Sequence, residues 1–318
     1  PQEALWYETT FEVPAAWRRG NDVLLHFGAV DWRAEVYVND LLVGSHTGGY
    51  TPFSFDITPA LSAKGVQKLT VKVTDSTDKG FQPHGKQVLE PHGIWYTPVT
   101  GIWQTVWIEP VPAANHIAGI TTRSDIRAGV LSVDVKTART GSDRVCVTLS
   151  ADGKTLAERS SMAGQPVHLA VEHPRLWSPD DPYLYDLTVT LVRDGRVIDR
   201  AESYAALREI ATGRDANGIE RMTLNGRPLF HFGPLDQGWW PDGLYTAPTD
   251  EALLYDIRFT KQLGFNMIRK HIKVEPERWY WHCDREGILV WQDMPSGDMS
   301  TGKWEPHRYG AGTDAARS

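Results

Sequence analysis

The stretch Gly264-Phe265-Asn266-Met267-Ile268-Arg269-Lys270-His271 decides the fold of this chain. A helix-like pattern ends at Gly264, and strand-like residues follow it. That strand carries a cation, Arg269, and a titratable ring, His271, to its C-terminal end. Parallel α/β barrels build their sites from polar side chains at the C-terminal ends of their strands. The stretch therefore predicts a functional site on a parallel sheet.

The sequence on either side of this stretch alternates between strand and helix. We expect strands at residues 229–233, 265–268 and 288–291, with helices at 248–264 and 276–287 between them. Thr249 suits the N-cap of the first helix, and Gly287 suits the end of the second. The order β, α, β, α, β implies parallel pairing with right-handed crossovers. Residues 211–318 are therefore expected to begin a parallel α/β barrel.

Polar or aromatic residues follow each of these three predicted strands. The candidate substrate-binding residues are Asp236, Trp239 and Trp240 after the first strand, Arg269 and His271 after the second, and Asp293 after the third. Strand ends of a barrel open on one face, so these side chains are expected to converge. Structural roles remain open: a core histidine, a structural ion pair and core tryptophans. If Asp236 and Asp293 were to cleave a glycoside, two carboxyls would have to lie about 5–5.5 Å apart for retention or about 6.5–9.5 Å apart for inversion, and the sequence fixes no such distance.

Short strands separated by turns fill the first third of the chain. Strands are expected at residues 6–13, 23–27, 34–39, 41–44, 68–74 and 102–108. Asn39-Asp40 is a hairpin-turn signal between two of them. Because no helical stretch interrupts these strands, residues 1–112 are predicted to form an antiparallel sandwich such as a jelly roll.

A second run of strands follows a predicted linker at residues 111–116. The strands are expected at residues 130–137, 145–150, 167–171 and 184–192. The segment has the size of an immunoglobulin-like sandwich, which we place at residues 113–210. It shows no chemistry of its own and is interpreted as a spacer.

One stretch of the first domain, residues 80–101, is too polar and glycine-rich for a plain strand. It contains Lys86 and Gln87 together with the aromatics Trp95 and Tyr96. A loop of this length is uncommon and often functional. Two interpretations remain open: a mobile surface loop, or a loop that reaches into a neighbouring site. The aromatic side chains favour order over disorder.

Composition narrows the class of protein. The net charge of -7 and the pI of about 5.9 argue against a nucleic-acid or anionic-membrane partner. No apolar run reaches the roughly 18 residues of a transmembrane helix. The two cysteines, Cys146 and Cys283, are expected to be unpaired buried thiols. The chain begins at Pro1, so its start can be trimmed and its compartment, cytoplasmic or exported, stays open.

Six motifs together resemble a known family. They lie at residues 30–39, 48–53 together with 56–58, 100–104, 176–179, 264–271 and 287–291. On these the chain resembles glycoside hydrolase family 2, the family of β-galactosidases, β-glucuronidases and β-mannosidases. The resemblance covers nearly the whole chain. It implies a jelly-roll sugar-binding-type domain, an immunoglobulin-like sandwich and a (β/α)8 TIM barrel that carries the active site, of which this chain holds the first three strands.

The resemblance also implies roles for the strand-end residues. Arg269 and His271 look like the family's substrate-site Arg and His, and Asp293 sits where the family keeps acidic residues. The family works by retention with two Glu on later barrel strands, the first of them after an Asn. The chain contains no Asn-Glu pair, so no catalytic residue is expected in it. No metal or cofactor is carried over.

The expected function is therefore that of a β-galactosidase-like glycosidase with a carbohydrate substrate and an incomplete catalytic site. β-Glucuronides and β-mannosides are alternative substrates. A non-catalytic carbohydrate-binding module and an inactive fragment are alternative functions. A partial barrel exposes sheet edges and apolar faces, which makes a homo-oligomer possible.

Overall fold

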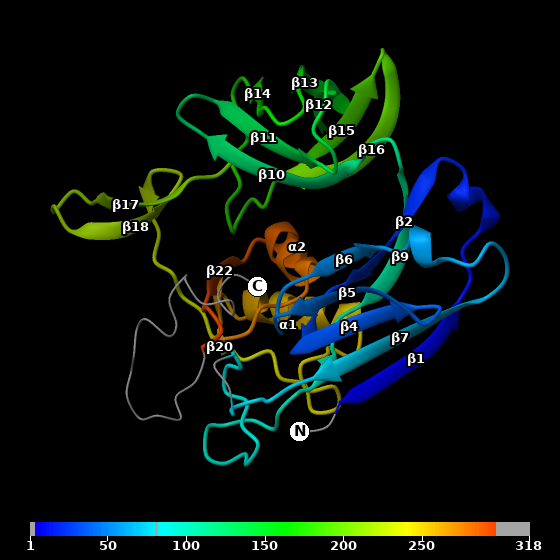
Figure 1. Ribbon diagram of the computed structural model, residues 1–318. Helices are drawn as coiled ribbons and strands as arrows, with labels where there is room; N and C mark the ends of the chain where they lie inside the picture. Colours follow the sequence, from blue (N-terminus) through cyan, green and yellow to red (C-terminus); the bar gives the residue numbers. More distant parts are fainter. Residues whose placement is uncertain (1–3, 80–81, 297–318) are drawn as a thin grey trace.

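The computed structural model describes residues 4–79 and 82–296. Figure 1 shows two β-sandwiches, the first in blue and cyan and the second in green, with the C-terminal helices between them. The remaining residues of the expected first and third domains, 1–3, 80–81 and 297–318, lie outside the described residues. No helix of the described part is both long and apolar enough to span a membrane.

The first sandwich packs a sheet of order β1-β7-β4-β5 against a sheet of order β6-β2-β9. Its strands are β1 (Leu5–Phe11), β2 (Asn21–Phe27), β4 (Arg33–Val38), β5 (Leu41–Thr47), β6 (Phe53–Asp56), β7 (Gln67–Thr74) and β9 (Val106–Pro112), with a small ladder of β3 (Val30–Asp31) and β8 (Gly101–Ile102) and the 3-10 turns η1 (Ala15–Arg18) and η2 (Thr58–Ala60). Alternate residues of β4 and β7 are buried between the sheets. Asn39 and Asp40 both have positive φ, 49° and 64°, so the predicted hairpin turn is confirmed.

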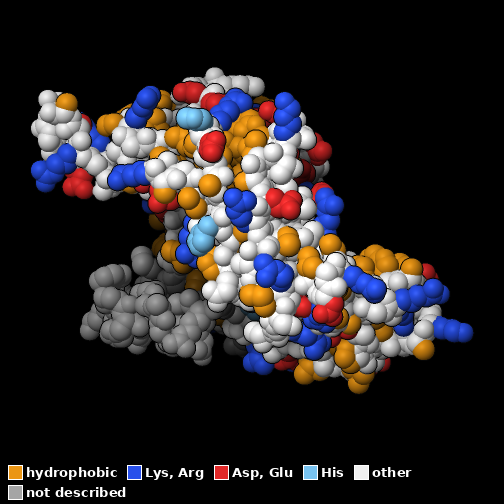
Figure 2. Space-filling view, turned by 90° about the horizontal axis from the view of Figure 1, so that it is seen from above, with side chains coloured by type: hydrophobic (Ala, Val, Ile, Leu, Met, Phe, Trp, Pro, Cys, Tyr) orange, Lys and Arg blue, Asp and Glu red, His pale blue; other side chains and the backbone are white. Residues whose placement is uncertain are grey.

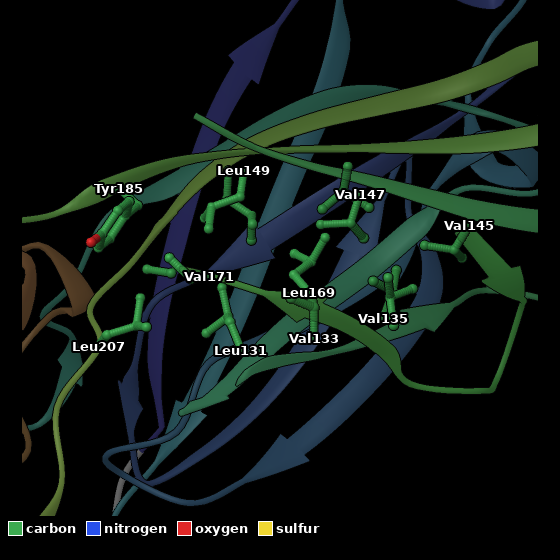
Figure 3. Packing of buried hydrophobic residues seen from close by; sticks show 14 of the residues in the cluster. Leu131, Val133, Val135, Val145, Val147, Leu149, Leu169, Val171, Tyr185 and Leu207 are labelled. Carbon is green, nitrogen blue, oxygen red and sulfur yellow. The ribbon is translucent and has the colours of Figure 1, made fainter. Parts of the chain in front are cut away.

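The second sandwich packs a sheet of order β10-β11-β14 against a sheet of order β13-β12-β15-β16. Its strands are β10 (Ile117–Asp125), β11 (Val130–Thr137), β12 (Arg144–Ala151), β13 (Lys154–Met162), β14 (Val167–Ala170), β15 (Tyr185–Arg193) and β16 (Arg196–Ala205). Figure 3 shows the inward side chains meeting between the sheets, among them Val133 from β11, Val147 from β12 and Leu169 from β14. These three side chains are fully buried, so alternation with period two explains this core.

A hairpin leaves the second sandwich and projects from the body of the molecule in both Figure 1 and Figure 2. It consists of β17 (Ile210–Arg214) and β18 (Glu220–Leu224), which continues through the Asn225-Gly226 turn into β19 (Arg227–Pro228). Positively and negatively charged side chains intermingle over the face shown in Figure 2. No broad single-sign surface is therefore visible on that face.

The C-terminal part forms a small parallel sheet covered by two helices. β20 (Leu235–Asp236), β21 (Met267–Lys270) and β22 (Leu289–Gln292) pair in parallel, in that order. The helices are α1 (Asp250–Gln262) and α2 (Glu277–Glu286). The Thr249 hydroxyl accepts a hydrogen bond from the Ala252 amide at 3.1 Å, and Gly287 adopts φ 80°, so both predicted helix boundaries are confirmed.

Three local expectations for strands were wrong. The strand expected at residues 229–233 is irregular, and β20 forms further along the chain. The Asn266 side chain explains this, because its amide donates to the Phe230 carbonyl at 2.9 Å and accepts from the Phe232 amide at 2.9 Å. Those two backbone groups are thereby satisfied without a ladder. β21 starts two residues later than expected, and the strand predicted at 102–108 is split into β8 and β9.

An aromatic cluster joins the first sandwich to the C-terminal part. Trp103, in the break between β8 and β9, donates from its indole to the Gly49 carbonyl at 2.8 Å and packs edge-on against Tyr245. The Tyr245 hydroxyl lies 3.3 Å from that of Tyr50. All three rings are buried. The break in the predicted strand therefore serves to place Trp103 in this junction.

The second sandwich is joined to α2 through Asp284. The indole of the fully buried Trp177 donates to the Asp284 carbonyl at 2.7 Å, and Arg208 pairs with the Asp284 carboxylate at 2.7 Å. The Tyr204 hydroxyl donates to the same carboxylate at 2.9 Å. Both sandwiches therefore hold the parallel sheet in a fixed position relative to themselves.

Candidate functional site at the ends of the parallel strands

Arg269, His271 and Asp293 form one hydrogen-bonded cluster at the ends of β21 and β22. The Arg269 guanidinium donates twice to Asp293, from Nε to Oδ1 and from Nη2 to Oδ2, each at 3.0 Å. His271 Nδ1 lies 2.8 Å from Asp293 Oδ2. The parallel register explains this convergence, because the Asp293 amide donates to the Lys270 carbonyl at 3.0 Å. The structure thus brings these three predicted residues together.

The electrostatics of this cluster favour a charged carboxylate. Burial alone would raise the pKa of Asp293, but hydrogen bonds and charge from Arg269 and His271 outweigh it and lower that pKa. An ionised carboxylate can only accept, so Nδ1 of His271 carries the hydrogen in this bond and Nε2 is left for another partner. Arg269 remains 45% exposed, which leaves part of its fork available to a ligand.

Asp236 belongs to a different, buried network. Its Oδ2 accepts from the Lys270 ammonium at 2.6 Å, and Lys270 also donates to Glu275 at 2.9 Å. Lys273 lies 3.0 Å from the same Glu275 oxygen and donates to the carbonyls of Gly238 and Tyr245 at 2.6 and 2.9 Å. We call Asp236, Lys270, Lys273 and Glu275 the buried quartet.

The quartet fixes the loops that follow β20 and β21. Only 1% of each lysine side chain is exposed, so these charges depend on one another rather than on water. Burial lowers the pKa of Lys273 despite Glu275. Burial also acts to lower the pKa of Lys270, but Glu275 and Asp236 outweigh it and raise that pKa. This network was not predicted from the sequence, where its signal was three charged residues, Lys270, Lys273 and Glu275, soon after the strand expected at residues 265–268.

The two predicted tryptophans have different surroundings. Trp239 stands against Tyr96, at 4.6 Å between ring centroids, and against Tyr245 at 5.4 Å. Trp240 packs instead against the core cluster beneath the helices, which includes Leu253 and Trp279. Trp239 therefore lies beside the loop of the first domain, whereas Trp240 contributes to the helix-side core.

The loop of the first domain reaches the strand ends. The amides of His84 and Gly85 both donate to the Ser296 carbonyl, at 2.9 and 3.0 Å. Gly85 has φ +62°, and a Cβ there would stand 3.0 Å from the Ile272 carbonyl oxygen. A glycine is therefore needed for this close approach. Of the two interpretations left open by the sequence, the contacts agree with a loop that extends into the neighbouring domain.

Two observations within residues 4–79 and 82–296 concern metal binding and thiol chemistry. No group of three or more His, Cys, Asp or Glu in these residues is arranged to hold a metal ion. Cys146 and Cys283 are both free; Cys283 is buried as expected, whereas Cys146 is only half-buried. Burial raises the pKa of the Cys283 thiol. Asp236, Glu275 and Asp293, at the described strand ends, are each paired with a cation.

The family models identify the first two domains. The model described as glycosyl hydrolases family 2, sugar binding domain, matches residues 2–112, and the model described as glycosyl hydrolases family 2 matches residues 115–208. The chain therefore belongs to glycosyl hydrolases family 2.

Individual relatives agree with this membership. A β-galactosidase of Thermoanaerobacter pseudethanolicus is 27% identical over 91% of this chain and 39% of its own length. A putative β-glucuronidase of Formosa agariphila is 29% identical over 92% of this chain and 27% of its own. The structure of a β-glucuronidase from Ruminococcus gnavus in complex with D-glucuronic acid superposes with a TM-score of 0.80 and covers 94% of this chain and 52% of that one. At 24% identity, this likeness shows that the two chains share a fold and no more. The chain thus spans between about a quarter and a half of the length of these proteins, and corresponds to the N-terminal part of the enzymes.

Proposed function

We propose that the chain is the N-terminal part of a glycosidase that hydrolyses terminal β-glycosides. In this proposal residues 1–112 form a jelly-roll domain, residues 113–210 an immunoglobulin-like sandwich and residues 211–318 the first part of a (β/α)8 barrel. The relatives named β-galactosidase and β-glucuronidase support the reaction class.

The barrel assignment is supported by the faces that the C-terminal part leaves uncovered. β20 and β22 are both edge strands of the parallel sheet. Tyr255 and Phe259 on α1 and Leu263 at its C-cap form an exposed stripe with a spacing of four residues, and each is 46% exposed or more. An apolar stripe at this spacing is the face with which a helix packs on a neighbour. Further barrel strands and helices would cover these edges and this stripe.

The observation that carries the proposal is the Arg269–Asp293–His271 cluster at the strand ends. Oδ1 of its carboxylate accepts one hydrogen bond and keeps one lone pair for a sugar hydroxyl, and its guanidinium keeps a free amino group for a sugar oxygen. Trp239 offers a ring in the segment that follows β20, where it packs against Tyr96 and Tyr245. Asp236 acts indirectly, because the buried quartet holds it. A site of paired polar groups rejects a wrong epimer strongly, since a mismatch leaves buried groups unpaired.

Hydrolysis needs more than this cluster supplies. A retaining glycosidase uses one carboxyl as nucleophile and another as acid/base, about 5–5.5 Å apart. Asp293 is bound by Arg269 and His271, and Glu275 by two lysines. Neither carboxylate is free to attack or to protonate a glycosidic oxygen. We therefore assign sugar binding, and no catalytic residue, to the described strand ends.

Saturation-transfer NMR with methyl β-D-galactoside, methyl β-D-glucuronide and methyl β-D-mannoside tests this proposal on the 318-residue chain. At least one sugar is expected to receive saturation, and Asp293→Ala should abolish it. Asp180→Ala is the matched control, because Asp180 is exposed on the second sandwich. Binding that survives Asp293→Ala would remove the cluster from the site. In parallel, the 318-residue chain should not hydrolyse chromogenic β-glycosides. If it does and Asp293→Asn abolishes the turnover, Asp293 is catalytic and our assignment of it to sugar binding alone is refuted.

A second candidate function, a non-catalytic sugar-binding module, is favoured by one feature of the first sandwich. A cavity of about 370 Å³ opens between the edge strands β1 and β9, with Tyr7, Phe11 and Trp107 in its lining. Aromatic rings can stack on sugar faces. Trp107→Ala in the same NMR experiment separates the two functions, because loss of saturation there would place the sugar in this cavity.

A further inference from the structure

Lys86 lies on the loop of the first sandwich and places its ammonium near the ends of the parallel strands. Its ammonium lies 3.3 Å from the side-chain oxygen of Gln237, one residue after β20, and 5.8 Å from the centre of the Tyr96 ring. The side chain is half-buried. Within the described residues, no carboxylate oxygen comes within ion-pair distance of it.

The backbone around Lys86 is held on both sides. Its carbonyl accepts from the Tyr96 amide at 2.7 Å, and Gly85 before it packs against the Ile272 carbonyl. Gln87 after it is 1% exposed and donates to the buried Asp31 at 3.2 Å. A lysine carried by such a fixed loop loses less freedom on binding a ligand than a lysine on a mobile one.

The other cations at the strand ends already have anionic partners. Arg269 is paired with Asp293, and Lys270 and Lys273 share the carboxylates of the buried quartet. Lys86 is the exception in the described part of the site, since its hydrogen bond goes to a neutral amide. An ammonium forms its strongest hydrogen bonds with anionic oxygen, and partial burial strengthens the preference.

We propose that Lys86 is a specificity-determining residue that binds an anionic substituent, a carboxylate or a sulfate, on the sugar held at the strand ends. This inference rests on the proposed sugar-binding function and adds to it a residue from the first domain and an acidic class of substrate. It favours acidic sugars over the neutral galactoside that the sequence suggested. Gln237 orients the ammonium, and the Tyr96 ring lies beside it.

Binding constants for three classes of methyl β-glycoside test the inference on the 318-residue chain by NMR titration. The neutral probe is methyl β-D-galactoside, the carboxylate probes are methyl β-D-glucuronide and methyl β-D-galacturonide, and the sulfate probe is methyl β-D-galactoside 6-sulfate. At least one acidic probe should bind about tenfold more tightly than the neutral one, which corresponds to about 1.4 kcal/mol. Lys86→Met should erase this preference, and Lys86→Arg should retain part of it. Lys64→Met is the matched control, because Lys64 is an exposed lysine in the turn before β7.

The outcomes separate this inference from the function beneath it. If neutral and acidic sugars bind equally and Lys86→Met changes neither, the proposed function stands and the inference is overturned. If Lys86→Met lowers the melting temperature and weakens all probes alike, Lys86 is a structural tether and the inference is also overturned. If no probe binds, the proposed function fails and the inference fails with it. Preference for the sulfate or for the carboxylates identifies which anion the lysine selects.

Discussion

Replacing Lys270 by methionine should loosen the ends of β20 and β21 while leaving both sandwiches intact. The ammonium of Lys270 stands 2.6 Å from Asp236 and 2.9 Å from Glu275, and 1% of the side chain is exposed. Lys270→Met leaves Glu275, itself 2% exposed, with Lys273 as its remaining cation. Breaking a buried ion pair from one side costs about 3–5 kcal/mol. Because Asp236 is 24% exposed and water can reach it, we take about 3 kcal/mol.

Hydrogen exchange measured by mass spectrometry reports this loss locally. The His271 amide donates to the Asp236 carbonyl at 2.8 Å, and the Asp293 amide donates to the Lys270 carbonyl at 3.0 Å. A loss of about 3 kcal/mol accelerates exchange at these amides about a hundredfold where local opening limits it. Peptides from the second sandwich should exchange as in the parent chain.

Lys68→Met is a matched control for this substitution. Lys68 also faces two carboxylates, Glu8 at 3.0 Å and Asp40 at 3.5 Å, but its side chain is 40% exposed. Exposed pairs of this kind contribute little, so exchange near Lys68 should not change measurably. If Lys270→Met accelerates exchange at His271 by less than about threefold, the buried quartet does not hold the strand ends and the reasoning is refuted.

Three further substitutions test other parts of the account. Burial, and after it a nearby carboxylate, raises the pKa of Asp31 above 3.8, so the folded protein loses stability as the pH rises from about 3.8 towards the raised pKa. The melting temperature of Asp31→Asn should therefore increase relative to that of the parent as the pH rises from 4 to 8. A difference that stays constant with pH would contradict this. Gly233→Ala places a Cβ against the backbone of the neighbouring strand and should cost about 1–3 kcal/mol in urea unfolding, whereas Gly141→Ala, with open space around it, should cost nothing measurable. Arg269→Lys loses the two-pronged bond to Asp293 and should weaken sugar binding in NMR titrations with an unchanged melting temperature; unchanged binding would exclude the guanidinium from the site.

Features encoded by local sequence could be predicted. The Asn39-Asp40 turn needs two residues that tolerate positive φ. Thr249 caps α1 by accepting a hydrogen bond from the Ala252 amide, only three residues away in the sequence. The meeting of Arg269 with Asp293 followed from a general rule, because parallel strands end on one side of the sheet.

Features set by tertiary contacts could not be predicted from the residues alone. A lysine on a strand is usually a solvated residue, and only the fold shows that Lys270 lies over the Trp279 ring, 4.4 Å from its centre, with two carboxylates beside it. The Asn266 side chain replaces a strand ladder through bonds to residues more than thirty positions away. The loop that carries Lys86 likewise contacts Ser296, which is about two hundred residues further along the chain.

The central claim is that a sugar binds where the parallel strands end. A crystal structure of this chain soaked with the tightest-binding methyl β-glycoside tests it most directly. We predict sugar density within hydrogen-bond distance of Arg269 and Asp293, beside Trp239. Density confined to the cavity between β1 and β9, with the strand ends occupied by water alone, would contradict the claim.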